Sequence, residues 1–346
     1  MKNKIRSYPS RWWIVKLFMY VERYIPLSLL ISPLFFALPL SIAGVYISQV
    51  THTQIFTRGV IFGMIWLAIA PWLLTSAYRS VYNFFDENRE KFLTDDDSYN
   101  GLKLAMLKDL GSPMYYLVAI PLVAVPVWGL LNTVYLESHS LIQIWAGVVF
   151  GLIFYFASMG FWGISRFNNI FEEICKQKIR FDPYNADNFG GLSFLGQFNI
   201  KGPQYFFTGS LLFPMAFETL NYLPDKDIIS LAYWGVLLLY FALGISGFLI
   251  PQLSIKDLIA KYKDKSLSHS EETLQTLLTN LCIDKCDDKE LAEVVKLKID
   301  VYYKYFHERI LAVKEWPFDW KIILQILASL ATPLIVAILE TILNLK

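Results

Sequence analysis

Seven stretches of the chain are long and apolar enough to cross a lipid bilayer as helices, and they constrain the fold more than any other feature. About 20 residues of helix cover the hydrocarbon core, where a helix satisfies its own backbone hydrogen bonds. The seven stretches are residues 26–48, 59–80, 113–135, 141–165, 204–220, 228–251 and 322–345. A chain that is 55% hydrophobic agrees with this pattern. The sequence therefore predicts an all-α, polytopic membrane protein with seven transmembrane helices.

The distribution of Lys and Arg predicts how the chain is oriented. Basic residues gather at the N-terminus and in residues 79–108, 166–201 and 256–314, whereas the alternate connections hold only Arg58 and Lys226. Cytoplasmic connections of membrane proteins carry the excess of Lys and Arg. We therefore expect a cytoplasmic N-terminus, an outer C-terminus, and a multipass protein of the cell (inner) membrane. The formal net charge of +1 gives no reason to expect a nucleic-acid partner.

The connections divide the chain into four parts. These are an amphipathic interfacial helix (1–24), a six-helix membrane region (25–252), cytoplasmic helices (253–316) and the last transmembrane helix (317–346). Within the six-helix region, three hairpins return in helices that continue into the cytoplasm near residues 81–112 and 166–203. A polar stretch after Ser266 is expected to separate the continuation of the sixth span from a helix at residues 271–281. The apolar faces of these extensions and of residues 287–314 need partners, so we expect a small intracellular helical domain.

A polar stripe runs along the last transmembrane segment. Its members follow one another at steps of four, three, four, four and four, which places them on one face of a helix. They are Gln325, Ser329, Thr332, Val336, Glu340 and Asn344. Lipid cannot satisfy such a stripe, so it needs a protein or water partner. Two interpretations stay open: the stripe packs against helices of the same chain, or it lines a water-filled pore built by several copies.

The pore interpretation predicts a role for each position. Glu340 concentrates cations at the outer mouth, the polar side chains replace part of their hydration shell, and Val336 forms an apolar gate. The expected function is then an oligomeric, ligand- or partner-gated cation channel, most simply a homotetramer. The alternative is a small-molecule transporter or membrane sensor, a monomer or dimer with its ligand site in an outer cavity between helices.

Residues 182–196 form the most distinctive local motif. Gly190 and Gly191 indicate tight turns with positive φ, and Asp182, Asn185 and Asp187 bring side-chain oxygens that bond to the backbone in such turns. The same oxygens would suit a hard cation, but their spacing is not that of a calcium loop, so a solvated or capping role is the better interpretation. A membrane enzyme that uses Asp182 and Asp187 with a divalent metal is the third function to consider.

The sequence gives little support for disulfide bonds, zinc binding or nucleophilic catalysis. The three cysteines, Cys175, Cys282 and Cys286, fall in segments assigned to the cytoplasm and are expected to be free thiols. No His-x-x-x-His zinc spacing occurs, and no histidine lies beside a membrane serine in sequence. We therefore expect no catalytic residue, no resident metal and no cofactor, and the chain is not expected to be an enzyme.

Two resemblances accompany these residues. The run Asn185-Ala186-Asp187, followed by Gly190-Gly191-Leu192 and Leu195-Gly196, resembles a His-Pro-Asp-x-x-Gly-Gly-Leu-x-x-Leu-Gly loop of uncharacterised prokaryotic multipass membrane proteins. The His and Pro are replaced here, and the resemblance implies fold and compartment alone. The layout of the whole chain is also similar to that of the insect gustatory and odorant receptor channels. That likeness implies a ligand-gated tetrameric cation channel whose last membrane helix lines the pore.

Overall fold

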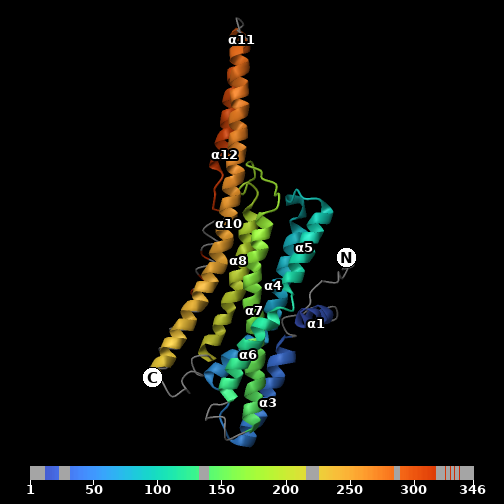
Figure 1. Cartoon of the computed structure of the whole chain (residues 1–346), viewed down its shortest axis with the longest axis vertical. Coiled ribbons are helices and arrows are strands. Elements are labelled where there is room, and N and C mark those ends of the chain that lie inside the picture. Colours follow the sequence, from blue (N-terminus) through green and yellow to red (C-terminus); the bar gives the residue numbers. More distant parts are fainter. Residues whose placement is uncertain are drawn as a thin grey trace.

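The computed structural model describes residues 12–22, 32–131, 140–215, 226–283 and 289–316, together with Leu324, Ala328, Ala331 and Ile335. Within these residues the chain is helical throughout, and its one β-type contact is an isolated bridge between Phe92 and Ile179. The all-α prediction is therefore confirmed. Figure 1 shows an elongated bundle from which one helical hairpin projects. The elements are α1 (Trp13–Glu22), a π-helical turn (Pro33–Ala37), α3 (Leu38–Thr51), α4 (Arg58–Glu87), α5 (Asp96–Leu110), α6 (Tyr115–Leu131), α7 (Ser140–Cys175), α8 (Ser193–Phe207), η4 (Thr208–Leu212), α10 (Lys226–Ile283), α11 (Lys289–Tyr302), a second π-helical turn (Tyr303–His307) and α12 (Glu308–Ala312).

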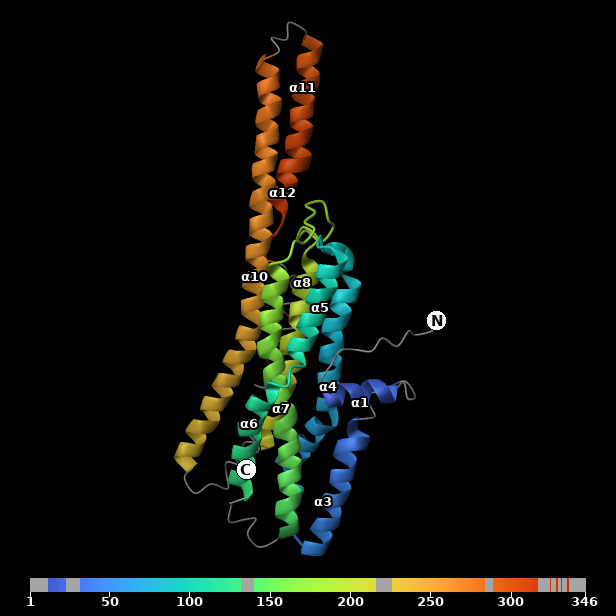
Figure 2. The same ribbon diagram turned by 45° about the vertical axis from the view of Figure 1, so that its right-hand side comes forward.

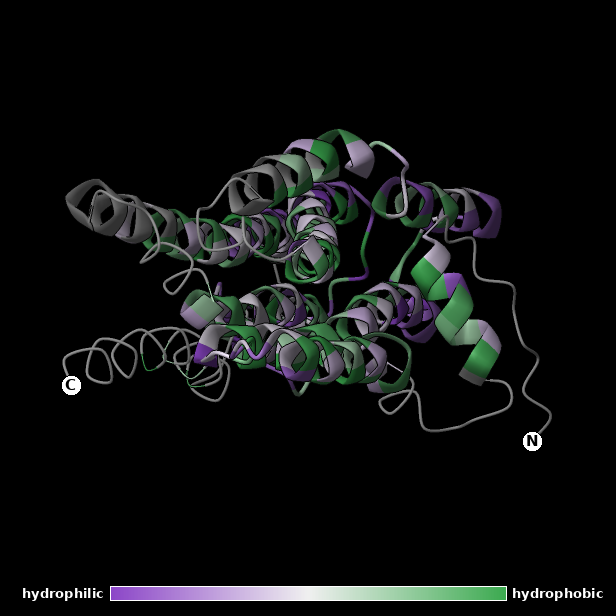
Figure 3. Ribbon diagram, turned by 90° about the horizontal axis from the view of Figure 1, so that it is seen from below, coloured by the Kyte–Doolittle hydropathy of each residue, from purple (hydrophilic) through white to green (hydrophobic). Residues whose placement is uncertain are grey.

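Four helical segments in the described part of the chain are long and apolar enough to cross a membrane. They are Pro33–Thr51, Arg58–Glu87, Ser140–Cys175 and Leu237–Thr276. Apolar side chains also cover the outside of the bundle, as Ile42 on α3, Leu117 on α6 and Leu238 on α10 illustrate. Figure 3 shows this hydrophobic colouring along the helices. An all-helical bundle that is apolar both inside and outside is compatible with a membrane protein.

The structure describes the remaining predicted spans only in part. Most of predicted span three is α6, and residues 132–135 lie outside the described residues. Predicted span five starts inside α8, passes through η4, and leaves the described residues after Met215. Of predicted span seven, the structure describes four separate positions.

The predicted continuation of the returning helices is confirmed. α4 runs for 30 residues and α7 for 36, well past the ends of their apolar spans. The Thr57 side chain caps the start of α4 by accepting a hydrogen bond from the Val60 N–H, and at the other end Asn88 Nδ2 donates to the Phe84 carbonyl. α5 then folds back beside α4, where the Tyr99 hydroxyl donates to the Phe85 carbonyl at 2.6 Å.

The predicted helix break after Ser266 is wrong. α10 is one helix of 58 residues, about 87 Å long at 1.5 Å per residue. No Gly or Pro occurs between residues 252 and 283. The polar residues of this stretch instead bond within the helix, because the hydroxyls of Ser268, Thr273 and Thr276 each donate to the carbonyl one turn back.

The helix predicted for residues 287–314 is present as α11, a π-helical turn and α12. These elements return alongside α10 and form the projecting hairpin of Figure 2. We expected their apolar face to be buried, but it is exposed. The reason is that α10 carries the hairpin beyond the end of the bundle. The exposed side-chain fractions are 50% for Val294, 65% for Leu297, 45% for Val301 and 61% for Tyr305.

α1 lies across the bundle instead of along it (Figure 2). Ile14, Val15 and Phe18 are buried on its inner face, and Trp13 Nε1 donates to the Tyr155 hydroxyl at 2.8 Å. This orientation is the one expected of an amphipathic helix at a membrane interface.

Candidate functional site

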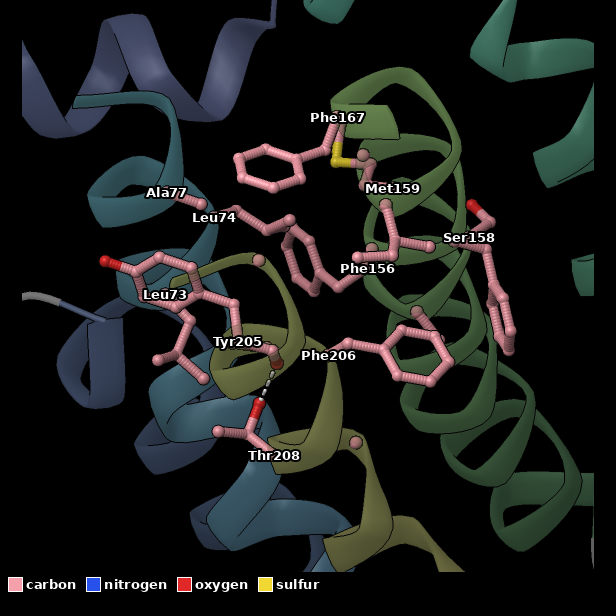
Figure 4. Close-up of a pocket in the computed structure, with 18 of the residues that line it drawn as sticks. Leu73, Leu74, Ala77, Phe156, Ser158, Met159, Phe167, Tyr205, Phe206 and Thr208 are labelled. Carbon is pink, nitrogen blue, oxygen red and sulfur yellow. Dashed lines mark hydrogen bonds between the residues drawn. The ribbon is translucent and has the colours of Figure 1, made fainter. Parts of the chain in front are cut away.

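A cavity of about 580 Å³ lies between α4, α7, α8 with η4, and α10. We call it the interhelical cavity. Figure 4 shows its wall on α4, α7 and α8. Its wall is built almost wholly of aliphatic and aromatic side chains, and its volume falls within the range of small-molecule sites. The lining includes Trp66, Leu73, Leu74 and Ala77 of α4, Phe156, Met159, Gly163 and Phe167 of α7, Lys201, Tyr205 and Phe206 of α8, and Tyr240 of α10.

Small residues on one side of α7 leave the space open. A Cβ atom added at Gly160 or Gly163 would meet nothing within 4 Å, although both residues line the cavity. Farther along α7 the contact with α8 is close, because a Cβ added at Gly202 of α8 would come within 2.8 Å of the Phe167 ring. Phe156 and Phe206 point into the space between α4 and α7 in Figure 4.

Polar side chains are few in the cavity wall, and Tyr205 forms one cluster with two serines of α4. The Tyr205 hydroxyl lies 3.0 Å from Ser76 Oγ and 3.1 Å from Ser80 Oγ, which ties α8 to α4. Lys201 precedes Tyr205 by one helical turn and is solvent-exposed. Deeper in the wall, Trp66 is 6% exposed, and its Nε1 donor has no acceptor among the described residues. An unpaired buried donor in an apolar wall is costly, which favours a bound group that accepts from it.

The sequence by pattern alone does not predict this cavity. The available signal was the run Ala157, Gly160 and Gly163, small residues at a spacing of three on one side of a membrane helix. That pattern usually indicates close helix packing, and only the positions of α4 and α8 show that the space is left open.

The distinctive loop motif forms a closed, hydrogen-bonded turn, which we call the Asp187 loop (residues 181–192). Asp187 Oδ1 accepts from the backbone N–H groups of Phe189 and Gly191, and Oδ2 accepts from the Ser193 N–H at 3.2 Å. Asn185 Oδ1 in turn accepts from the Asp187 N–H at 3.2 Å. Through Oδ2, Asp187 serves as an acceptor for the first N–H of α8, whose N-cap position is Leu192, and α8 begins earlier than the predicted end of the loop.

The structure brings the predicted loop residues together. Gly190 and Gly191 have φ values of +64° and +80°, as their glycine identity indicated, and Asp182 Oδ1 accepts from the Tyr184 N–H. Burial tends to raise the pKa of Asp187, but the hydrogen bonds from Gly191, Phe189 and Ser193 outweigh it and hold the pKa below its usual range. Both carboxylate oxygens of Asp187 thus serve the backbone.

The Asp187 loop also joins several helices. The Lys314 N–H donates to the Asn188 carbonyl at 2.9 Å, which fixes the base of the projecting hairpin. The Phe181 ring stacks on Tyr262 of α10 with ring centres 5.7 Å apart. Burial lowers the pKa of Lys91, and the charge of Asp187 offsets part of that shift. The loop is therefore a structural junction of α8, α10 and the hairpin.

The other residues singled out in the sequence provide less evidence for a functional site. All six residues of the polar stripe, Gln325 to Asn344, lie outside the described residues, as does Cys286. Cys175 is a free thiol, and burial raises its pKa to about 12, so it is a poor nucleophile at neutral pH. Within the described ranges no three His, Cys, Asp or Glu residues are grouped so that they could hold a metal ion.

Comparison with known proteins identifies no relative of this chain. No protein-family model, no curated protein sequence and no solved structure matches the chain. The fold and the cavity define a helical bundle compatible with a membrane protein, with an apolar chamber between four of its helices.

Proposed function

We propose that this chain is a polytopic membrane protein that binds a small, largely apolar molecule within its helix bundle, as a sensor or a transporter does. The observation that carries the proposal is the interhelical cavity, an open volume of about 580 Å³ whose wall holds the Trp66 Nε1 donor, which has no acceptor among the described residues. Close-packed interiors leave few voids larger than a water molecule, so a space of this size favours a ligand.

The proposed topology keeps seven spans, a cytoplasmic N-terminus and an outer C-terminus in the cell membrane. The loop charges and the four long apolar helices support it. In this topology the cavity lies in the cytoplasmic half of the membrane, between residues 66–81 of α4 and 154–167 of α7, and not in the outer cavity first expected. The projecting hairpin and the Asp187 loop then lie in the cytoplasm.

Filling the cavity is expected to abolish binding without unfolding the protein. In the Gly163→Leu variant the new side chain occupies the open volume, because nothing lies within 4 Å of the added Cβ. The measurement is saturable quenching of tryptophan fluorescence by 9,10-dibromo-octadecanol in nanodiscs of neutral lipid. We expect at least a tenfold loss of apparent affinity, with the melting temperature unchanged within about 2 °C.

Gly151→Leu is the matched control. Gly151 lies on the same helix, it too has nothing within 4 Å of an added Cβ, and it does not line the cavity. The control should bind the probe as the unmodified protein does. Equal binding by the Gly163→Leu variant would refute the cavity as the ligand site.

A gated cation channel is the second candidate, and the polar stripe from Gln325 to Asn344 favours it. A homotetramer would place this stripe on a central axis, and the exposed apolar face of α11 supports association between copies. Either function allows the cavity ligand to regulate the protein.

The channel proposal predicts currents that depend on two stripe residues. In planar bilayers, Glu340→Gln is expected to lower single-channel cation conductance about twofold or more, because the outer mouth loses its negative charge. Val336→Ala is expected to increase leak in the closed state, because the apolar gate is widened. Thr341→Ser, off the stripe, is the control, and purified protein that carries no current would exclude the pore.

A further inference from the structure

Lys201 is the one charged residue among the described residues that line the interhelical cavity. We propose that the cavity binds a single-chain amphipathic anion, with its acyl chain among the aromatic side chains and its anionic head at Lys201. This inference rests on the proposed function, since it names the chemistry of the ligand for the same cavity. A free long-chain fatty acid and one chain of an anionic membrane lipid share that chemistry.

Among the residues that the structure describes, no carboxylate neutralises the charge of Lys201. Two cations on helices that line the cavity or pack beside them do have carboxylate partners: Lys103 pairs with Asp86, and Arg166 Nη1 lies 3.6 Å from Asp109 Oδ2. Lys201 makes no ion pair with any described residue and keeps its ammonium group exposed at the cavity wall. An uncompensated ammonium beside an apolar chamber fits an anionic head better than a neutral or cationic one.

The part of the cavity near Lys201 is suited to a head group. Tyr205 lies one turn after Lys201 on α8, so the two side chains share a face of the helix. The Tyr205 hydroxyl is held by Ser76 and Ser80 of α4, and Ser80 itself lines the cavity. Three hydroxyls therefore meet about one helical turn from Lys201, and those of Tyr205 and Ser80 line the cavity, where each can share a hydrogen bond with a carboxylate or phosphate oxygen.

The rest of the cavity is suited to an extended chain. From Lys201 to Phe213 the wall follows α8 and η4 for 12 residues, about 18–20 Å of helix rise. Along that length Phe206, Phe213 and Tyr240 present aromatic faces, and on the opposite side α7 presents glycine. A largely apolar space along this length, with its charged residue near the start of α8, matches the polarity of a fatty-acyl chain better than that of a compact polar solute.

The location agrees with entry from the inner leaflet. In the proposed topology the first turns of α8 lie at the cytoplasmic interface, where the leaflet carries anionic lipid. Trp12, at the start of the interfacial segment that includes α1, lines the same cavity. A head group at Lys201 would thus stay at interface depth while the chain enters the bundle.

The test compares an anionic and a neutral probe of the same chain length. The full-length protein in phosphatidylcholine nanodiscs is titrated with 9,10-dibromostearate and with 9,10-dibromo-octadecanol, and saturable tryptophan quenching is recorded. For Lys201→Ala we expect the apparent affinity for the stearate to fall at least tenfold, while that for the alcohol changes less than twofold. Lys201→Arg should keep stearate affinity within about threefold. Lys261→Ala, an exposed lysine of α10 away from the cavity, should change neither.

The outcomes separate this inference from the proposed function. If stearate and alcohol bind equally well and Lys201→Ala weakens neither, the anionic head is refuted while the apolar cavity ligand stands. If neither probe quenches saturably, the proposed function fails as well. Competition identifies the source: relief of quenching by phosphatidylglycerol supports a lipid head group, and relief by unbrominated stearate alone supports a free fatty acid.

Discussion

Replacing Asp187 with Ala is expected to destabilise the protein by about 3 kcal/mol. Three backbone N–H groups, those of Phe189, Gly191 and Ser193, lose their acceptor, and each such loss costs about 1 kcal/mol. The Asp187 loop also fixes the base of the projecting hairpin through Asn188, so we expect the hairpin to loosen. Thermal unfolding in detergent and limited proteolysis near residue 188 measure the two effects.

Two other variants should lose less stability than Asp187→Ala, because they remove fewer hydrogen-bond acceptors. Asp187→Asn keeps an acceptor oxygen for Phe189 and Gly191 and turns its NH₂ toward the Ser193 N–H, so a loss of about 1–2 kcal/mol is expected. Asp182→Ala, which removes a single acceptor from the exposed Tyr184 N–H, should cost at most about 1 kcal/mol. If Asp187→Ala were no more harmful than Asp182→Ala, the capping role would be wrong.

The contribution of Asp187 should also depend on pH. Its pKa is lower in the folded protein than in the unfolded chain, so the ionised form stabilises the fold. This stabilisation is fully present above the usual Asp pKa of about 3.9 and is lost as the pH falls through the lower folded-state value. The stability difference between the unmodified protein and Asp187→Asn should therefore be constant from pH 5 to 8 and shrink in acid.

Replacing Gly190 with Ala is expected to have a second large effect, in excess of 2 kcal/mol. The residue has φ +64°, a conformation that costs a non-glycine residue about 1 kcal/mol. In addition, the new Cβ would overlap the Phe181 ring, which stacks flat on Tyr262 of α10. The overlap should separate the loop from α10 and lower the melting temperature measured in detergent.

Gly191→Ala serves as the control for backbone strain. Gly191 has a similar φ of +80°, but an added Cβ would lie 3.4 Å from its nearest neighbour, Asn185 Nδ2. This variant should carry the conformational cost of about 1 kcal/mol and little more. Equal losses in the two alanine variants would show that the Phe181 contact contributes nothing.

Several local features of the fold could be predicted because they depend on short-range sequence. Apolar runs of about 20 residues predicted the helices. The helical pattern past Ser80 correctly predicted that the second helix continues beyond its apolar span, and α4 ends at Glu87. The glycines predicted the positive φ values at positions 190 and 191. The predicted break after Ser266 failed, because polar residues alone do not end a helix when Ser and Thr hydroxyls bond back to its carbonyls.

The candidate site was harder to predict from the sequence. The small residues Gly160 and Gly163 have the same spacing whether a neighbouring helix fills the gap or leaves it open. In the same way, Asp187 offered oxygens to a cation or to the backbone, and only the folded turn shows that three N–H groups use them.

By itself the sequence determined that the chain is helical, that apolar helices dominate it, and where its tight turn lies. These properties follow from residue type and periodicity along one segment. Only the packing of the helices shows that four of them surround a chamber, that Lys201 lines it without a carboxylate partner among the described residues, and that the hairpin projects with its apolar face exposed. Those properties arise from distances between segments far apart in the chain, which local patterns do not encode.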